Sequence, residues 1–204
     1  MARAVAVATV LLAVCFPGLG FADSPGDGVY GRFDGDVSVS EAMGAGAMGV
    51  SNPELLLSAE LRARYLDSAG VVLAFGWRPA VADASFFAGV ELRPFFPVRF
   101  LINGFSGHEL LDRMVDSIGI ELGAVFAPLD SMVGVGLGFG VGFDLPFSDS
   151  VAVHLGMRHH RLSADDQGGP DRSISELSLV GLLTFQQRVD VGLAAREQPR
   201  YSRD

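Results

Sequence analysis

The chain lacks the features that would mark a crosslinked protein, a nucleic-acid-binding protein or a helical membrane protein. Its single cysteine, Cys15, stands near the start of the 204 residues, so the rest of the chain has neither disulfides nor thiolate chemistry. It contains no lysine, and its net charge of −9 counts against binding to nucleic acid or adsorption to an anionic membrane. No internal run of about 18 apolar residues occurs, so we expect no transmembrane helix.

The first residues have the pattern of a secretory signal peptide. Arg3 supplies a positive charge, residues 4–15 form a short apolar core, and Gly20-Phe21-Ala22 is a small-x-small cleavage site. Because the apolar core is short, a cleaved signal is favoured over an N-terminal anchor helix. We therefore expect the protein to be exported.

Strict alternation of apolar residues with small or polar ones recurs along the exported chain. Residues 132–145 alternate six large apolar side chains with five glycines. A period of two predicts a β-strand, because successive side chains leave opposite faces. The same alternation, least regular in the last segment, predicts seven more strands at residues 29–39, 55–65, 71–78, 86–93, 118–126, 151–160 and 176–186. Longer loops are expected at 41–52 and 163–172.

The face opposite the apolar one carries charges of both signs. A face in water needs no balance of charge, whereas charges confined to an interior must be paired. Seven acidic and six basic residues occupy this second face, together with two histidines. We therefore predict a polar lumen network made of Arg32, Asp34, Asp36, Glu60, Arg62, Arg64, Arg78, Glu91, Arg93, Glu121, Asp144, His154, Arg158, His160 and Glu176.

These faces predict an all-β fold, an eight-stranded antiparallel up-and-down transmembrane β-barrel with lipid outside. Most of the segments are long enough to cross a bilayer as tilted strands. The glycines of residues 134–142 leave room for long arginine side chains in the lumen. Aromatic residues near strand ends are typical of the membrane interfaces, and here they are Tyr65, Trp77, Phe86, Phe126, Phe143 and Phe185. The expected organisation is a signal peptide at 1–22, a β-barrel domain at 23–186 and a C-terminal tail at 187–204.

The segment between the fourth and fifth predicted strands does not fit a short barrel turn. The pattern from Ser106 to Glu109 is that of a capping box, and residues 110, 111, 114 and 115 form one apolar helical stripe. A short helix at 106–116 is therefore predicted. It either lies at the membrane surface or tucks into the mouth of the barrel, and a packing role is favoured over a gate.

With its signal sequence, eight alternating segments and polar inward face, residues 28–186 resemble the small outer-membrane β-barrels of Gram-negative bacteria, of OmpA/OmpX-like architecture. The resemblance carries no diagnostic motif, and the chain ends in Asp204 where many members end in an aromatic residue. It implies location in the outer membrane, contact with outer-membrane lipid and insertion by the barrel assembly machinery. The implied role is structural, adhesive, porin-like or occasionally lipid-modifying, and a monomer is favoured.

Histidines form the one cluster of potentially reactive side chains in the sequence. His154 and His160 share a face and could meet Glu121 or Glu176, and a metal site needs three or four convergent ligands. Imidazole groups also pair with carboxylates, so membership of the polar network near an extracellular rim is favoured. The His-x-Ser pair of barrel lipid A deacylases is missing, because the serine after His160 is Ser163. We predict no catalytic residue, no cofactor and no metal site.

Three functions remain open at this point. The leading one is a non-enzymatic outer-membrane barrel with a salt-bridged lumen and a structural, adhesive or narrow porin-like role. A secreted soluble barrel that binds an apolar ligand would need the opposite orientation, with Val and Leu inside and Arg and Glu outside. A lipid A-modifying hydrolase would need a nucleophile beside a base, and the sequence shows no such pair.

Overall fold

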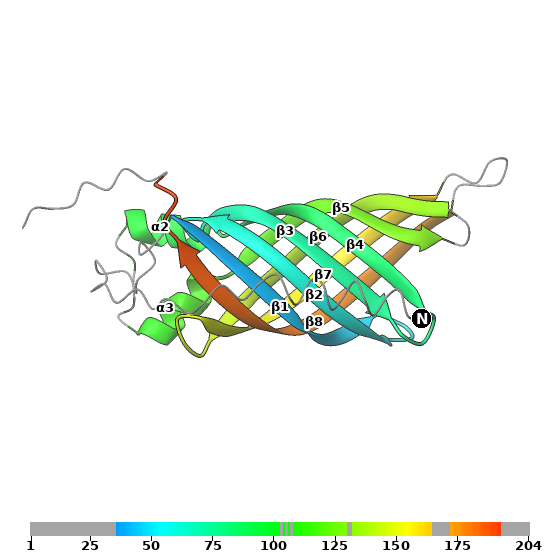
Figure 1. The fold of residues 1–204 in the computed structure, drawn as a ribbon, viewed down its shortest axis with the longest axis horizontal. Helices are drawn as coiled ribbons and strands as arrows, with labels where there is room; N and C mark the ends of the chain where they lie inside the picture. The colour runs from blue at the N-terminus through cyan, green and yellow to red at the C-terminus, as the bar shows by residue number, and fades with distance from the viewer. Residues whose placement is uncertain are drawn as a thin grey trace, which may run out of the picture.

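The chain folds into a closed barrel of eight antiparallel strands in a computed structural model, which describes residues 36–102, 104, 106, 108–129, 132–164 and 172–192 (Figure 1). Each strand pairs with its neighbours in sequence, and β1 closes the barrel by pairing with β8. The predicted eight-stranded antiparallel barrel is confirmed. Its strands are β1 (Val37–Met48), β2 (Glu54–Tyr65), β3 (Ala69–Arg78), β4 (Asp83–Leu92), β5 (Gly119–Leu129), β6 (Met132–Pro146), β7 (Val151–Ala164) and β8 (Arg172–Val189).

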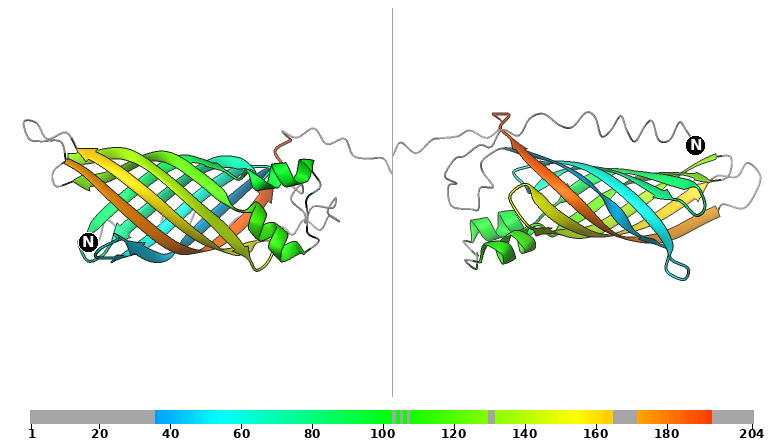
Figure 2. Two further views of the ribbon diagram at one scale, coloured as in Figure 1. Left: turned by 180° about the vertical axis from the view of Figure 1, so that it is seen from behind. Right: turned by 60° about the horizontal axis from the view of Figure 1, so that its bottom comes forward.

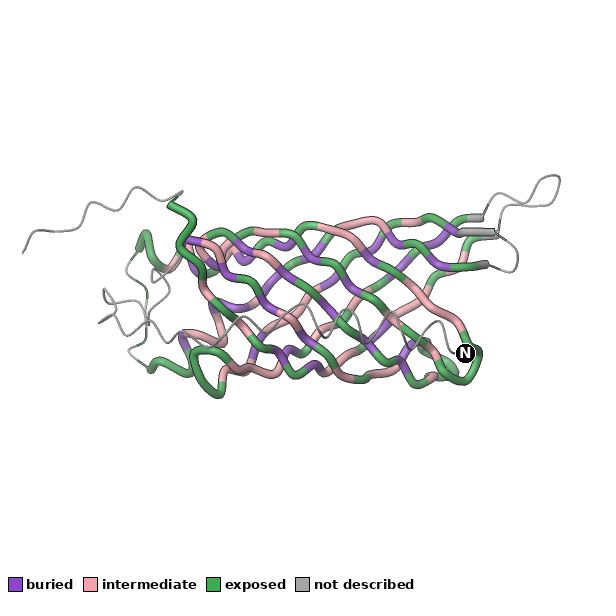
Figure 3. The backbone as a smooth tube through the Cα atoms, in the orientation of Figure 1, coloured by how far each residue is buried: buried purple, intermediate pink, exposed green. Residues whose placement is uncertain are grey.

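The barrel wall is apolar outside and polar inside. Buried and exposed residues alternate along the strands (Figure 3). In β2, Leu57, Leu61 and Tyr65 are 37–41% exposed on the outer face, whereas Glu60 and Arg62 are 4% and 2% exposed in the lumen. A soluble barrel would have the reverse arrangement, so that alternative is wrong for this fold. The exposed outer face also carries Met43, Leu73, Phe75, Val90, Leu122, Leu137, Phe139, Met157, Leu179 and Leu183.

The first strand ends later than the sequence predicts, and residues 29–35 of the predicted strand lie outside the described residues. Alternation predicts a strand at 29–39 and a loop at 41–52, but β1 crosses most of that loop and only residues 49–53 connect it to β2. The sequence of this strand shows no clear alternation of apolar and polar residues, because alanines and glycines occupy both of its faces. They fit close packing against β8, because a Cβ on Gly46 would lie 1.8 Å from the carbonyl oxygen of Leu179.

Two short helices, α2 (Phe95–Leu101) and α3 (Glu109–Asp116), occupy the connection between β4 and β5. They project past one end of the barrel, the helical end, which also carries the turns at 66–68 and 147–150 (Figure 2). The opposite end, the loop end, carries the connections at 49–53 and 79–82. Neither helix in the described part of the chain has the length and apolar character needed to span a membrane.

The helix predicted at 106–116 is shorter than expected, and α2 was not predicted. The N-cap of α3 is His108, and no side chain caps the helix. The capping-box prediction is wrong because the Ser106 hydroxyl accepts a hydrogen bond from the His108 amide instead. The predicted signal peptide and residues 193–204 of the predicted tail lie outside the described residues, and β8 continues past 186 to Val189.

Candidate functional site

Arg62 of β2 lies at the centre of a buried group of charges in the lumen. Its Nη2 is 2.8 Å from Glu121 Oε1, and its Nη1 is 3.2 Å from Glu91 Oε1. Its Nε also donates a hydrogen bond to Glu60 Oε2 at 3.1 Å. The four residues come from β2, β4 and β5, and each is at most 4% exposed. One guanidinium group therefore links three strands across the barrel.

Two more arginines extend this group toward the helical end. Arg64 Nε donates to Glu91 Oε2 at 2.8 Å. Arg93 donates to Glu91 Oε1 at 3.0 Å and to Asp144 Oδ2 at 2.6 Å. Glu91 thus accepts contacts from three arginines, which satisfies both oxygens of a carboxylate that is 3% exposed.

Arg158 of β7 joins the same charges from the opposite side. It is 2.6 Å from Glu121 Oε2 and 3.1 Å from Glu60 Oε1. Four guanidinium groups and four carboxylates therefore form one connected network whose charges cancel, here called the lumen network: Arg62, Arg64, Arg93, Arg158, Glu60, Glu91, Glu121 and Asp144. A connected and neutral set is the arrangement in which burial of charge costs least.

His154 completes the lumen network as an imidazole group between two charges. Its Nδ1 is 2.7 Å from Asp144 Oδ1, and its Nε2 is 3.1 Å from Arg62 Nη2. A guanidinium group only donates, so Nε2 accepts and Nδ1 donates to the carboxylate. In a serine hydrolase the corresponding Nε2 would face the nucleophile, whereas here it faces the Arg62 guanidinium group. His154 is the fourth residue of β7, near the helical end, and His160 lies further along the same strand toward the loop end.

Glu60, Glu121 and His154 each present one possible metal ligand, and these atoms lie within 4.8 Å of one another. The sequence suggests that His154 could meet Glu121, but it does not suggest Glu60 as the third member, because the trio combines residues from β2, β5 and β7. Arg62 contacts all three groups. The cation that these ligands already hold is therefore a guanidinium group.

The glycines of β6 make room for side chains that lean across the lumen. A Cβ on Gly140 would lie 2.8 Å from Glu121 Oε2, and one on Gly142 would lie 2.6 Å from His154 Cε1. A Cβ on Gly138 would lie 2.8 Å from the Phe87 ring. The glycine face of β6 is therefore filled by side chains from other strands.

An apolar layer occupies the lumen next to the lumen network, and the sequence analysis does not predict it. The Phe87 ring holds the Arg158 guanidinium carbon 4.3 Å from its centroid and stacks with the His160 ring at 6.4 Å. His160 therefore lies against this layer rather than among the ion pairs. The layer, called the lumen plug, consists of the buried residues Val72, Ala74, Phe87, Val125, Ala127 and Leu162.

A second, smaller ion-pair group lies at the loop end. Arg78 donates to Glu176 at 2.9 Å, approaches Glu54 at 3.5 Å and also pairs with Asp83. The Arg78 side chain is 21% exposed, so water reaches this group. Asp36 lies instead at the helical end, buried, and accepts a hydrogen bond from the Val191 amide at 2.7 Å. The remaining two predicted lumen residues, Arg32 and Asp34, lie outside the described residues.

The helices carry an ion-pair clamp of their own. Arg99 of α2 donates to Asp116 Oδ1 of α3 at 2.8 Å and also pairs with Asp112. Both aspartates are fully buried. Burial of the guanidinium group lowers the pKa of Arg99, but its hydrogen bond to Asp112 and the charge of Asp116 outweigh this and raise the pKa above its usual range. The clamp fixes the relative orientation of the two helices.

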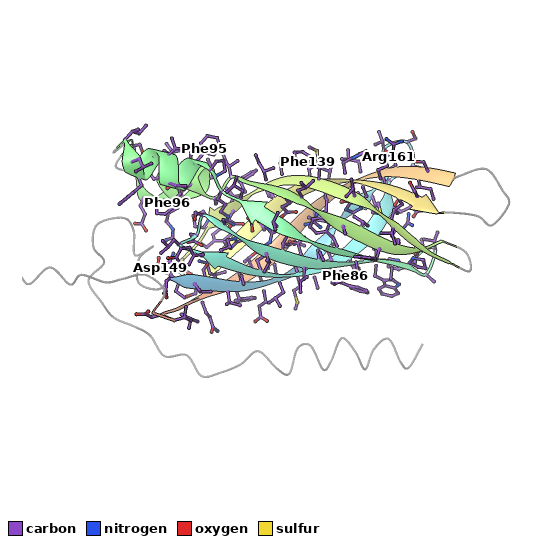
Figure 4. All side chains as sticks on the ribbon, turned by 90° about the horizontal axis from the view of Figure 1, so that it is seen from above. Phe86, Phe95, Phe96, Phe139, Asp149 and Arg161 are labelled. Atoms are coloured by element: carbon purple, nitrogen blue, oxygen red, sulfur yellow. The ribbon has the colours of Figure 1, made fainter. Side chains whose placement is uncertain are left out.

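A closed eight-stranded barrel with an apolar exterior and a paired polar interior is the architecture of small outer-membrane β-barrels. Figure 4 shows Phe86 and Phe139 on the outside of this barrel. The sequence itself matches no protein-family model and no curated protein.

Several solved structures are similar to this chain at low sequence identity. They include the N-terminal β-barrel domain of Pseudomonas aeruginosa OprF, with 12% identity over 75% of this chain and 99% of that chain and a TM-score of 0.49. Neisserial surface protein A has 12% identity over 74% of this chain and 96% of its own, with a TM-score of 0.44. Ail, the attachment invasion locus protein of Yersinia pestis, has 13% identity over 75% and 99%, with a TM-score of 0.40. At these identities the likeness concerns the fold alone.

Proposed function

We propose that this chain is a non-enzymatic outer-membrane β-barrel with a lumen closed to solutes, and that its role is structural or adhesive. The dimensions support a membrane-spanning barrel. The shortest strands, β3 and β4, have 10 residues. Ten residues extend about 33 Å, and a tilt of about 45° leaves about 23 Å across the bilayer, close to the apolar band of about 25 Å on outer-membrane barrels. The predicted signal peptide supports a periplasmic location of the helical end, where β1 begins and β8 ends.

The observation that carries the closed lumen is the lumen network itself. Its eight charges join strands on opposite sides of the barrel, and the lumen plug lies beside it. A cavity of about 30 Å³ beside Arg78 at the loop end and one of about 40 Å³ beside Arg93 at the helical end each have room for only a few water molecules. Solute passage would require several buried ion pairs to break.

Membrane fractionation and gel mobility test the location. The protein should sediment with the outer membrane, resist extraction by buffer, and migrate differently on a gel before and after boiling, because a closed barrel stays folded in mild detergent. Extraction by buffer alone, with identical migration before and after boiling, would remove the membrane assignment.

Conductance across a planar bilayer tests the closed lumen. The wild-type barrel should give no steady current. A Glu60→Ala/Arg62→Ala/Phe87→Ala variant shortens three inward side chains without changing the net charge and should conduct. Its matched control is Phe86→Ala, the outward neighbour that is 41% exposed, which should stay closed. Steady current through the wild-type protein would instead establish a narrow porin-like role.

A further inference from the structure

Large apolar side chains cover the outer side of the two helices at the helical end. In α2, Val98, Phe100 and Leu101 are 54%, 47% and 82% exposed. In α3, Leu110 and Leu111 are 65% and 46% exposed. Exposed large apolar side chains gathered on one pair of helices mark a surface that contacts something apolar.

Most charged residues of the helices face the opposite way, and the exception is Glu109 in the first turn of α3, whose side chain is 57% exposed. Asp112 and Asp116 lie one turn apart on α3, and both are fully buried. The clamp from Arg99 holds them against α2. In addition, Arg113 fastens α3 to the turn between β6 and β7, where its Nη1 is 2.8 Å from Asp149 Oδ1. Apart from Glu109, the helix pair is therefore apolar outside and charged inside, like the barrel wall.

The apolar side of the helices continues the outer face of the barrel. Leu92 at the end of β4 and Ile120 near the start of β5 are register partners, and they are 51% and 42% exposed. Phe95, 43% exposed, follows on the outer side of α2, whereas Phe96, 3% exposed, lies on the inner side (Figure 4). The apolar surface of β4 and β5 thus passes directly into the helices.

We propose that the pair of α2 and α3 is a lipid-binding element whose apolar side chains insert into the acyl-chain boundary of the leaflet at the helical end. The inference rests on the proposed membrane-spanning barrel. Helices with Phe and Leu on one side and Arg on the other lie in the plane of a membrane interface. Phospholipid is favoured over a protein partner because the patch is continuous with the lipid-facing wall. The element fixes the depth and tilt of this side of the barrel.

Tryptophan fluorescence in vesicles tests this proposal, because Trp77 is the chain's only tryptophan. Wild-type Trp77, on the outer face of β3, reports on the barrel. In a Trp77→Phe background, Leu110→Trp and Val98→Trp place one probe on each helix. Ser150→Trp, in the exposed turn at the same end, is the matched control. The vesicles contain phosphatidylcholine with or without bromine on the acyl chains.

The helix probes should lose intensity to the brominated chains to a degree comparable with Trp77, and their emission should shift to the blue. The Ser150→Trp probe should keep its intensity. If Trp77 is quenched and both helix probes are not, the lipid element is refuted while the barrel stands. In that case, blue-shifted emission of the helix probes means that protein covers the apolar side of the helices. Red-shifted emission means that this side is in water. If Trp77 is also unquenched, the membrane-spanning barrel fails as well.

Discussion

Replacing Arg62 with methionine is the sharpest perturbation that the lumen offers. The change keeps much of the side chain's volume but leaves Glu60, Glu91 and Glu121 without their shared partner, and it gives the lumen network one excess negative charge. Removing one partner of a buried ion pair costs about 3–5 kcal/mol. Each carboxylate keeps a contact to another arginine, so we expect a loss of about 3 kcal/mol in the free energy of unfolding.

Urea titration of the barrel folded in lipid vesicles measures this loss, with Trp77 emission as the probe of transfer to water. Arg161→Met is the matched control, because Arg161 is exposed, and it should change stability by less than about 0.5 kcal/mol. Adding Glu121→Gln to Arg62→Met restores neutrality and should recover about 1 kcal/mol or more relative to additive effects. Equal stability of Arg62→Met and the wild type would refute the argument for a tightly coupled network.

Two further pairs of substitutions probe the two faces of the wall. Gly140→Val should destabilise the barrel by about 1–3 kcal/mol in the same titration, because its Cβ would meet Glu121 Oε2 at 2.8 Å. Gly181→Ala, where a Cβ would be 3.6 Å from its nearest neighbour, should be tolerated, and equal effects of the two would contradict a filled lumen. Leu73→Arg, in the middle of β3, should cost about 2–4 kcal/mol, against about 0–1 kcal/mol for Val189→Arg at the end of β8. Similar costs at both sites would argue against lipid around the barrel.

The polarity of the barrel wall is readable from sequence where charge marks one face. In β2, Glu60, Arg62 and Arg64 alternate with apolar residues. The side of the strand that carries these charges is therefore the one expected to face the lumen, where opposite charges can pair with them. In β1 the alternation disappears, because alanine and glycine occupy both faces. The strand then depends on pairing with β2 and β8, which a local pattern does not record.

The packing inside the lumen is not readable in the same way. Alternation places Phe87 on the same face as Glu91 and Val72 on the same face as Arg78, but it does not show that these apolar residues pack into one layer of the lumen. The ion pairs depend on register and tilt, which bring Arg158 to Glu60 although 98 positions separate them. The direction of the α3 stripe depends on Arg99, which lies on another helix. Contacts between distant parts of the chain therefore determine the lumen packing, the ion pairs and the direction of the α3 stripe, which the two-residue periodicity does not reveal.

The pairing of β1 with β8 has a consequence for how the protein reaches its final state. The first strand of the barrel can complete its pairing only when the last strand is in place. The two pair from Val37 opposite Val189 to Met48 opposite Ser178. Until then both carry unsatisfied backbone amides and carbonyls, which hydrocarbon does not tolerate. Entry into lipid and joining of this seam are therefore coupled, and a chain interrupted before β8 has no stable place in the bilayer.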